Sequence, residues 1–195
     1  MNAQLEDLRK AIDGCTQCEL HKNRNHIVFG EGYEEARIML IGEGPGFEED
    51  KTGRPFVGRS GQLLDKILAV CNFSREKYVF IGNIVKCRPP ENRAPFPEER
   101  QTCLPYLLKQ IEIIDPPILI LLGATAIQGL LDPKAKISKE RGHWQRWNNR
   151  WVMPTYHPSA LLRNPNLKKD SWEDFKEVIK KYRELVDPTH YCEHF

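Results

Sequence analysis

Four short apolar runs alternate along this chain with segments of helical period, and this alternation limits the possible folds more than any other feature. The runs are ARIMLIG, KYVFIGNIVKC, PPILILLG and RWVMPTYH, at residues 36–42, 77–87, 116–123 and 150–157. Each run is mostly apolar throughout, which is typical of strands covered by helices on both faces. Strands that alternate with helices favour a parallel sheet. The sequence therefore predicts an α/β protein, a three-layer α/β/α arrangement with a central four-stranded, mostly parallel sheet.

The segments around these runs have the apolar spacing of amphipathic helices. Helices are expected at residues 3–13, 60–71, 97–114, 124–131 and 171–186. The chain has 195 residues and shows no internal repeat, low-complexity tract or interdomain linker. We therefore expect residues 1–195 to form a single domain.

Composition narrows the class of protein further. The chain is 40% hydrophobic, and no apolar run approaches the roughly 18 residues that a membrane span needs. The first residues, MNAQLEDLRKAIDGC, carry charges within a helical pattern and lack the apolar core of a secretory signal. We expect a cytoplasmic protein with no membrane partner. The net charge of +2 does not decide about nucleic acid, because a local basic patch sets phosphate affinity.

Three loops follow predicted strands directly: GEGPG, GNIVKC and PTYHPSALL. The carboxyl ends of parallel strands share one edge of a sheet, where α/β proteins bind their ligands. We therefore expect the three loops to converge on one pocket. The first loop continues through FEEDKTGRPFVG, and its four acidic side chains, glycines and prolines predict an exposed loop over residues 42–58.

Four of the six cysteines have the spacing of a metal site. Cys15 and Cys18 form a C-x-x-C pair, and Cys87 and Cys103 lie far downstream. Cysteines of a reducing compartment bind metals or act in catalysis more readily than they form disulfides. Four thiolates suit zinc or an iron–sulfur cluster, and the fifteen residues between Cys87 and Cys103 favour a [4Fe–4S] cluster over a zinc ribbon. Four unrelated buried cysteines are the alternative.

Three motifs, together with these cysteines, resemble a known family. GEGPGFEEDKTGRPFVGRSGQLL, GNIVKCRPPENRAPFPEE and HPSALLR, in this order, are similar to the iron–sulfur, thermostable type-4 branch of the uracil-DNA glycosylases. The resemblance extends from about Cys15 to Arg163. It implies a monomeric enzyme that flips deoxyuridine out of DNA and hydrolyses its N-glycosidic bond, with a [4Fe–4S] cluster on the four cysteines. A sliding clamp is a further candidate partner.

The resemblance implies two catalytic residues. Glu43 would stabilise the oxocarbenium-like sugar and orient the attacking water, and His157 would donate to uracil O2 as charge collects on the leaving base. Gly44 and Gly46 stand where the better-known branch of the superfamily carries an aspartate and a tyrosine. Glu43 therefore inherits the water-orienting role, and the barrier against the methyl group of thymine is assigned to Glu49.

The resemblance also implies a base pocket and a DNA surface. Phe56 would stack on the flipped ring, and the amide of Asn83 would pair with O4 and N3–H of uracil and reject cytosine. The residues expected to bind uracil are Gly42, Gly44, Glu49, Phe56, Asn83 and His157. Those expected to bind DNA are Leu161 and Leu162 as an apolar wedge, then Arg163, Asn92 and Arg88. A basic surface is expected from Lys86, Arg93, Arg54 and Arg59.

Other interpretations stay open at this point. A relative with broader specificity for deaminated bases would share these motifs. A relative that attaches covalently to the abasic site is disfavoured, because it would carry a histidine in an inserted basic loop near CRPPENRAP, where this sequence has neither the histidine nor a basic run. A non-catalytic, metal-containing nucleic-acid-binding module would keep the cysteines but lose the pocket residues. A phosphate-loop enzyme is disfavoured, since GEGPG fits neither G-x-G-x-x-G nor G-x-x-x-x-G-K-[ST].

Overall fold

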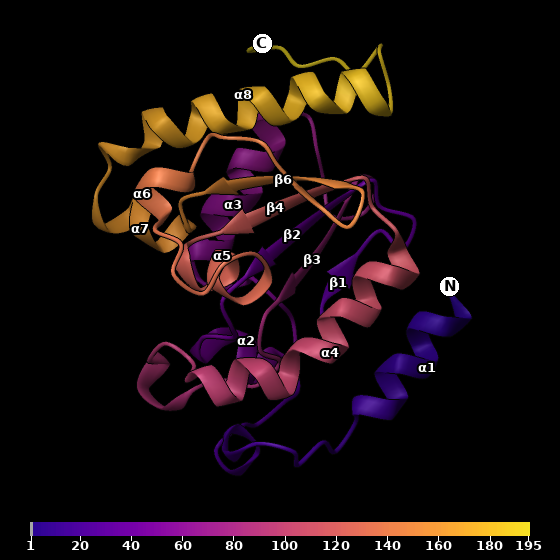
Figure 1. Ribbon diagram of the computed structural model, residues 1–195, viewed down its shortest axis with the longest axis vertical. Helices are drawn as coiled ribbons and strands as arrows, with labels where there is room; N and C mark the ends of the chain where they lie inside the picture. The colour runs from indigo at the N-terminus through magenta and orange to yellow at the C-terminus, as the bar shows by residue number, and fades with distance from the viewer. Residues whose placement is uncertain (1) are drawn as a thin grey trace.

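The computed structural model describes residues 2–195 and shows one twisted sheet with helices on both faces (Figure 1). The strands are β1 Glu31–Gly32, β2 Ile38–Gly42, β3 Val79–Asn83, β4 Ile118–Leu122, β5 Gln145–Trp147 and β6 Arg150–Thr155. The helices are α1 Ala3–Ile12, α2 Phe47–Thr52, α3 Arg59–Val70, α4 Pro97–Ile114, α5 Ala124–Leu130, α6 Ile137–Glu140, α7 Pro158–Arg163 and α8 Leu167–Leu185. Two 3₁₀ turns cover Glu19–Lys22 and Pro90–Asn92.

The sheet has the strand order β1-β3-β2-β4-β6-β5. Its four central strands are the four predicted ones, and they are all parallel. The predicted count of four was short by two, because β1 and β5 add antiparallel strands at the edges. These edge strands have two and three residues and none that is fully buried, so no apolar run marks them in the sequence.

Alternate residues of the central strands face two separate halves of the core. On one face, Met39 and Ile41 of β2 pack with side chains of α1, α4 and α5. On the other face, Ile38 and Leu40 pack with side chains of α3 and α8. Figure 1 shows α8 on one side of the sheet, with α1 and α4 on the other. The predicted three-layer α/β/α arrangement is confirmed.

The order of the strands places a crevice between β2 and β4. The chain leaves β2 to form β3 on one side and leaves β4 to form β6 on the other, although β2 and β4 are neighbours. Connections that depart in opposite directions open a ligand-binding crevice at the carboxyl ends of the two strands. Glu43 and Gly123, which directly follow β2 and β4, therefore flank this crevice.

The acidic stretch predicted as an exposed loop is partly helical and partly buried. Residues Phe47–Thr52 form α2, and Asp50 within it is fully buried. The Asp50 carboxylate accepts hydrogen bonds from the backbone N–H of Asn25, at 2.8 Å, and from the Asn25 side-chain amide. The prediction of an exposed loop was wrong because Asp50 is hydrogen-bonded to Asn25, 25 residues away in the sequence, and local composition does not reveal such a contact.

None of the helices within residues 2–195 combines the length and the apolar character that crossing a membrane requires.

Candidate active site

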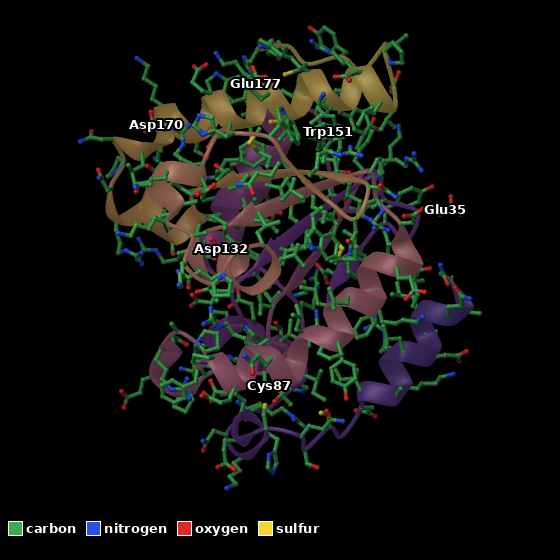
Figure 2. All side chains as sticks on the ribbon, in the orientation of Figure 1. Glu35, Cys87, Asp132, Trp151, Asp170 and Glu177 are labelled. Atoms are coloured by element: carbon green, nitrogen blue, oxygen red, sulfur yellow. The ribbon has the colours of Figure 1, made fainter. Side chains whose placement is uncertain are left out.

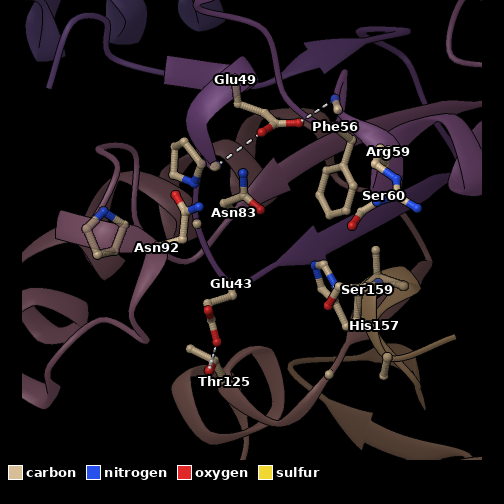
Figure 3. Close-up of a pocket in the computed structure, with 18 of the residues that line it drawn as sticks. Glu43, Glu49, Phe56, Arg59, Ser60, Asn83, Asn92, Thr125, His157 and Ser159 are labelled. Atoms are coloured by element: carbon tan, nitrogen blue, oxygen red, sulfur yellow. Dashed lines mark hydrogen bonds between the residues drawn. The ribbon is translucent and has the colours of Figure 1, made fainter. Parts of the chain in front are cut away.

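A cleft of about 680 Å³ opens at the carboxyl edge of the sheet (Figure 3). Its walls come from the loops that follow β2, β3, β4 and β6, so the predicted convergence of loops is confirmed. The volume is in the usual range for small-molecule sites, about 300 to 1,000 Å³.

Asn83 stands at the last position of β3 and points into this cleft. The residue is only 1% exposed, and its side-chain oxygen Oδ1 is buried without a hydrogen-bond partner. A buried amide oxygen without a partner costs free energy, so the site favours a ligand that donates to it. Gly42 lies directly beneath: a Cβ there would come within 2.5 Å of Asn83 Oδ1 and 2.6 Å of Phe56 Cζ. Only glycine fits at this position.

Phe56 forms the aromatic wall of the cleft and is held in an unfavourable backbone conformation, with φ at +53°. Arg75 fixes this conformation by donating to the backbone oxygen of Pro55, at 2.6 Å, and to that of Phe56. Gly61 allows the close approach, since a Cβ there would collide with the Phe56 backbone. The ring of Phe56 lies 5.5 Å from that of His157, centroid to centroid, inclined by 32°.

His157 caps the amino end of α7 and faces the cleft as a neutral imidazole. Its Nδ1 accepts a hydrogen bond from the backbone N–H of Ser159 at 3.1 Å and lies 2.8 Å from the Ser159 hydroxyl. Because a backbone N–H can only donate, the proton of the neutral ring is assigned to Nε2. Desolvation deep in the cleft, helped by the nearby positive charge of Arg163, lowers the pKa of His157 to about 4. The ring therefore offers an N–H donor without carrying a charge.

Glu43 lies across the cleft from His157 (Figure 3). Its Oε2 accepts a hydrogen bond from the hydroxyl of Thr125, in the first turn of α5. The backbone of this loop is fixed too, because Val85 N–H donates to Glu43 O at 3.2 Å and Ile84 N–H donates to Gly42 O at 3.0 Å. The loops after β2 and β3 thus hold one another in place.

Glu49 also lines the cleft, and its carboxylate braces the surrounding loop. Oε2 accepts from Gly46 N–H at 3.1 Å, and Oε1 accepts from the N–H groups of Val57 and Gly58, both at 2.8 Å. Gly44 lies in the same wall, where a Cβ would come within 2.7 Å of Val85 Cγ2. The expected residues of the base pocket are therefore gathered in one place.

The loop between β3 and α4 supplies one rim of the cleft through Asn92 and Arg93. Arg88 lies behind them: its Nε donates to Asn92 Oδ1 at 2.7 Å, and its guanidinium lies 5.2 Å from the ring centroid of Phe47. The expectation that Lys86 belongs to this basic surface is wrong. Lys86 is 0% exposed, and its ammonium donates into the protein interior.

The opposite rim comes from α7 and the start of α3. Arg163 and Arg59 line the cleft, whereas Arg54 turns away and pairs with a carboxylate of β1. Leu162 is 38% exposed, but Leu161 is buried and 1% exposed. Of the two leucines expected to form an apolar wedge, Leu162 is the one that the surface presents.

The four cysteines of the expected metal site meet at a second, small cavity. Cys15, Cys18, Cys87 and Cys103 all line this cavity, which measures about 20 Å³ and is partly open to solvent. Cys87 lies at the end of the molecule where the segment after α1 passes (Figure 2). Among residues 2–195, no three or more histidine, cysteine, aspartate or glutamate side chains are arranged as ready-made ligands of a single metal ion. The four thiols surround a cavity in which a larger metal group could be bound.

The surroundings of these four thiols suit cysteines that bind a metal group as thiolate anions. Arg24 donates to Cys87 Sγ at 3.4 Å, and the backbone N–H of Lys86 donates to Cys103 Sγ at 3.3 Å. Burial raises the pKa of the Cys18 and Cys87 thiols, and it raises that of Cys103 to about 11. Thiolates buried in this way require a bound cation to keep them deprotonated, and N–H donors beside the sulfurs are common around metal–thiolate groups.

Sequence reasoning did not identify Thr125, Ser159 or Arg75. Each acts on a predicted residue through a hydrogen bond. Ser159 lies within the motif HPSALLR and could have been found as a helix-capping partner of His157. No motif in the sequence around Thr125 or Arg75 indicates the contacts that these residues make.

The cleft as a whole is shaped for a flat, polar ring. Phe56 offers an aromatic face, and Asn83 offers a donor and an acceptor side by side at the ring's edge. The fold and the site together define an α/β protein with a cleft, suited to a flat polar ring, at the switch point of its sheet.

Comparison with known proteins shows the family. The model of the uracil DNA glycosylase superfamily matches residues 29–180, and the chain belongs to this superfamily, in its type-4 branch. A type-4 uracil-DNA glycosylase of Thermotoga maritima is 49% identical over 91% of this chain and 95% of its own length. Type-4 uracil-DNA glycosylases of Sulfurisphaera tokodaii and Archaeoglobus fulgidus are 42% and 41% identical, over 96% and 89% of this chain and 87% and 91% of their own lengths. The resemblance found in the motifs is confirmed.

Proposed function

We propose that this protein is a monofunctional uracil-DNA glycosylase, which flips deoxyuridine out of DNA and hydrolyses its N-glycosidic bond at the start of base excision repair. The observation that carries the proposal is the Asn83 amide, buried with an unpartnered oxygen at the end of the cleft where Phe56 stands. The names of the type-4 relatives support the same activity.

Asn83 would select the base by its edge. Its Oδ1 would accept from N3–H of uracil, and its Nδ2 would donate to O4. Cytosine presents the inverse pattern, with an acceptor at N3 and a donor at N4. Its binding would place acceptor against acceptor and donor against donor in a buried site, which carries a large free-energy penalty. Phe56 would stack on the ring. Both the Asn83 amide and the Phe56 ring lie close to Gly42, which would keep their relative positions fixed. Glu49 is proposed to exclude the methyl group of thymine by fixing the loop of Gly46, Val57 and Gly58.

Glu43 and His157 would act on the two halves of the breaking bond. As the base leaves, negative charge collects on uracil O2, and the Nε2–H of neutral His157 would donate to it. The sugar becomes cationic, and the Glu43 carboxylate would stabilise it and orient the water that attacks C1′. The water would give its hydroxyl to the sugar and one proton to the solvent or the departing base. The matched motifs contain Lys51 and Lys86, and neither lines the cleft, so no lysine is placed there as a Schiff-base nucleophile for lyase chemistry.

The partner is proposed to be DNA that contains uracil, bound across the two rims of the cleft. Arg163, Arg93 and Arg88 with its neighbour Asn92 would contact phosphates, and Leu162 would fill the gap left by the flipped base. The protein is proposed to act as a monomer, and a sliding clamp is proposed as a further partner. Six free cysteines fit a reducing compartment, which supports a cytoplasmic location.

Cys15, Cys18, Cys87 and Cys103 are proposed to hold a [4Fe–4S] cluster. The cluster would supply cross-links between segments of the fold rather than chemistry for hydrolysis, which transfers no electron. Arg24 and the backbone N–H of Lys86 would donate to its sulfur ligands.

The experiment is alkaline strand cleavage of duplex oligonucleotides that carry uracil, thymine or hypoxanthine opposite guanine. We expect release of uracil alone by the wild type, and at least a tenfold slower release by Asn83→Ala, since a hydrogen-bonding pair in the pocket is worth about 1.5 to 3 kcal/mol. Gln4→Ala, which removes an exposed amide from α1, is the matched control and should retain wild-type activity. Release of hypoxanthine would indicate the broader specificity. DNA binding without release of any base would overturn the proposal in favour of the non-catalytic module.

A further inference from the structure

Thr125 lies at the point where β4 turns into α5, in the wall of the cleft. The turn depends on Gly123, which has φ at +90° and whose Cβ, if present, would come within 2.9 Å of His157 Cβ. With glycine there, α5 can begin directly against the loops that carry Glu43 and His157. Thr125 is buried, at 8% exposure, although its side chain is polar.

The hydroxyl of Thr125 donates to Oε2 of Glu43 (Figure 3). Within residues 2–195, the Thr125 hydroxyl is the one group that makes a hydrogen bond to the Glu43 carboxylate. The backbone of Glu43 is fixed by the bond from Val85, but its side chain has three rotatable bonds that a backbone contact does not restrict. Glu43 is only half-buried, so packing alone does not select one rotamer.

The bond uses one carboxylate oxygen and leaves the other open. Oε2 receives the proton of Thr125, whereas Oε1 has both lone pairs available for the hydrogens of a water molecule. A threonine also suits the role because its branched Cβ restricts χ1, so the donor itself is held still. Orientation of a reacting group within a fraction of an ångström has a large effect on rate.

We propose that Thr125 is a positioning residue for Glu43, which orients the carboxylate so that Oε1 holds the attacking water. This inference rests on the proposed glycosylase function. Thr125 makes no contact with the base or the sugar in this role, and it acts only through Glu43. Its removal should therefore slow the chemical step and leave DNA binding unchanged.

The test is a double-mutant cycle of Thr125→Val and Glu43→Ala, measured as single-turnover release of uracil from a U·G duplex with enzyme in excess. Valine keeps the shape of threonine and removes the donor. We expect Thr125→Val to slow release about tenfold or more, as for a lost hydrogen bond to a charged group. In the Glu43→Ala background the same substitution should change the rate by less than about twofold. Thr125→Ser keeps the hydroxyl and should restore most of the wild-type rate.

Three further measurements make the outcome decisive. Fluorescence anisotropy with the same duplex should give equal affinities for wild type and Thr125→Val, and thermal unfolding should show both folded. Thr189→Val is the matched control, because it removes an exposed hydroxyl that donates to the Asp187 carboxylate at 2.7 Å, and it should release uracil at the wild-type rate. An equal loss from Thr125→Val in both backgrounds, or no loss in the wild-type background, would overturn the inference while the glycosylase proposal stands. A wild type that releases no uracil would overturn the glycosylase proposal itself.

Discussion

His157 is the residue that determines how the site responds to pH. Its pKa is lowered to about 4 because burial penalises the charged ring, so the imidazole stays neutral well below its ordinary value. We expect the rate of uracil release to show no loss from His157 protonation between about pH 8 and about pH 5, and a decline as pH falls towards 4. An NMR titration of the ring of the folded protein, beside the pH–rate profile, measures this directly. A ring that titrates near 6.5 would contradict the assignment.

The same residue affects stability with a defined sign. The unfolded chain binds a proton at this ring below about pH 6.5, whereas the folded protein does so only near pH 4. Within this window the unfolded state binds more protons, so the contribution of His157 to stability is present above pH 6.5 and declines as pH falls to about 4. A His157→Gln variant should lose this part of the pH dependence of its free energy of unfolding.

Individual residues of the site were predictable where a motif follows a strand. Asn83 and Glu43 directly adjoin strand ends, and His157 heads a loop at the same edge, so parallel-sheet topology brings them together. Thr125 was not predictable, since it meets Glu43 across 82 positions of sequence. Lys86 was misjudged because a lysine beside arginines indicates a surface, and only the structure shows that Asn83 O and Gln110 Oε1 accept its buried ammonium, at 3.0 and 2.6 Å.

At the scale of elements, the segment that carries Phe56 depends on Arg75 in the connection between α3 and β3. This guanidinium donates to two backbone oxygens of the segment, at Pro55 and Phe56, and pairs with Glu31 at 3.1 Å and Asp65 at 2.7 Å. Its side chain is 11% exposed. We expect Arg75→Ala to lower the free energy of unfolding by about 2 kcal/mol or more, because the backbone oxygens of the buried residues Pro55 and Phe56 lose their donor. It should also weaken uracil release, since Phe56 loses its fixed position.

Urea unfolding and uracil release of the same preparations test this dependence. Arg37→Ala removes an exposed arginine and is the matched control. Arg75→Lys should recover only part of the loss, because a lysine cannot reproduce the planar fork that serves two oxygens and two carboxylates. Full activity and stability in Arg75→Ala would show that the segment holds its conformation without this residue.

The central elements were predictable, and the short ones were not. The four parallel strands and the long helices follow from apolar periodicity, which reflects burial. Helix α2 and strands β1 and β5 depend on tertiary contacts instead, such as the bonds of Asp50 to Asn25. Pro105 lies inside α4, which continues through it as one helix from Pro97 to Ile114 and whose ribbon bends in Figure 1.

At the scale of the whole molecule, the cleft and the cysteine cavity share one segment of chain. Asn83 begins this segment at the base pocket, and Cys87 ends it at the cavity. Between them, the buried ammonium of Lys86 donates back to Asn83 O at 3.0 Å, while its backbone N–H donates to Cys103 Sγ. The stretch is thus fixed at both ends. The segment after α1 lies beside it, because Cys15 and Cys18 line the same cavity as Cys87.

Loss of one of the four proposed cluster cysteines should therefore destabilise the whole molecule rather than the cleft alone. We expect Cys87→Ser to abolish the visible absorption of an iron–sulfur protein and to lower the melting temperature, because the link between the segment after α1 and the segment before α4 is lost. Cys192→Ser is the matched control: Cys192 is buried but lies away from the cavity, where its thiol donates to Val70 O at 3.2 Å, a bond that serine can also make. It should keep the colour and the melting temperature. A colourless wild type purified without oxygen, or equal colour in both variants, would contradict the proposed cluster and leave the four cysteines as packing residues.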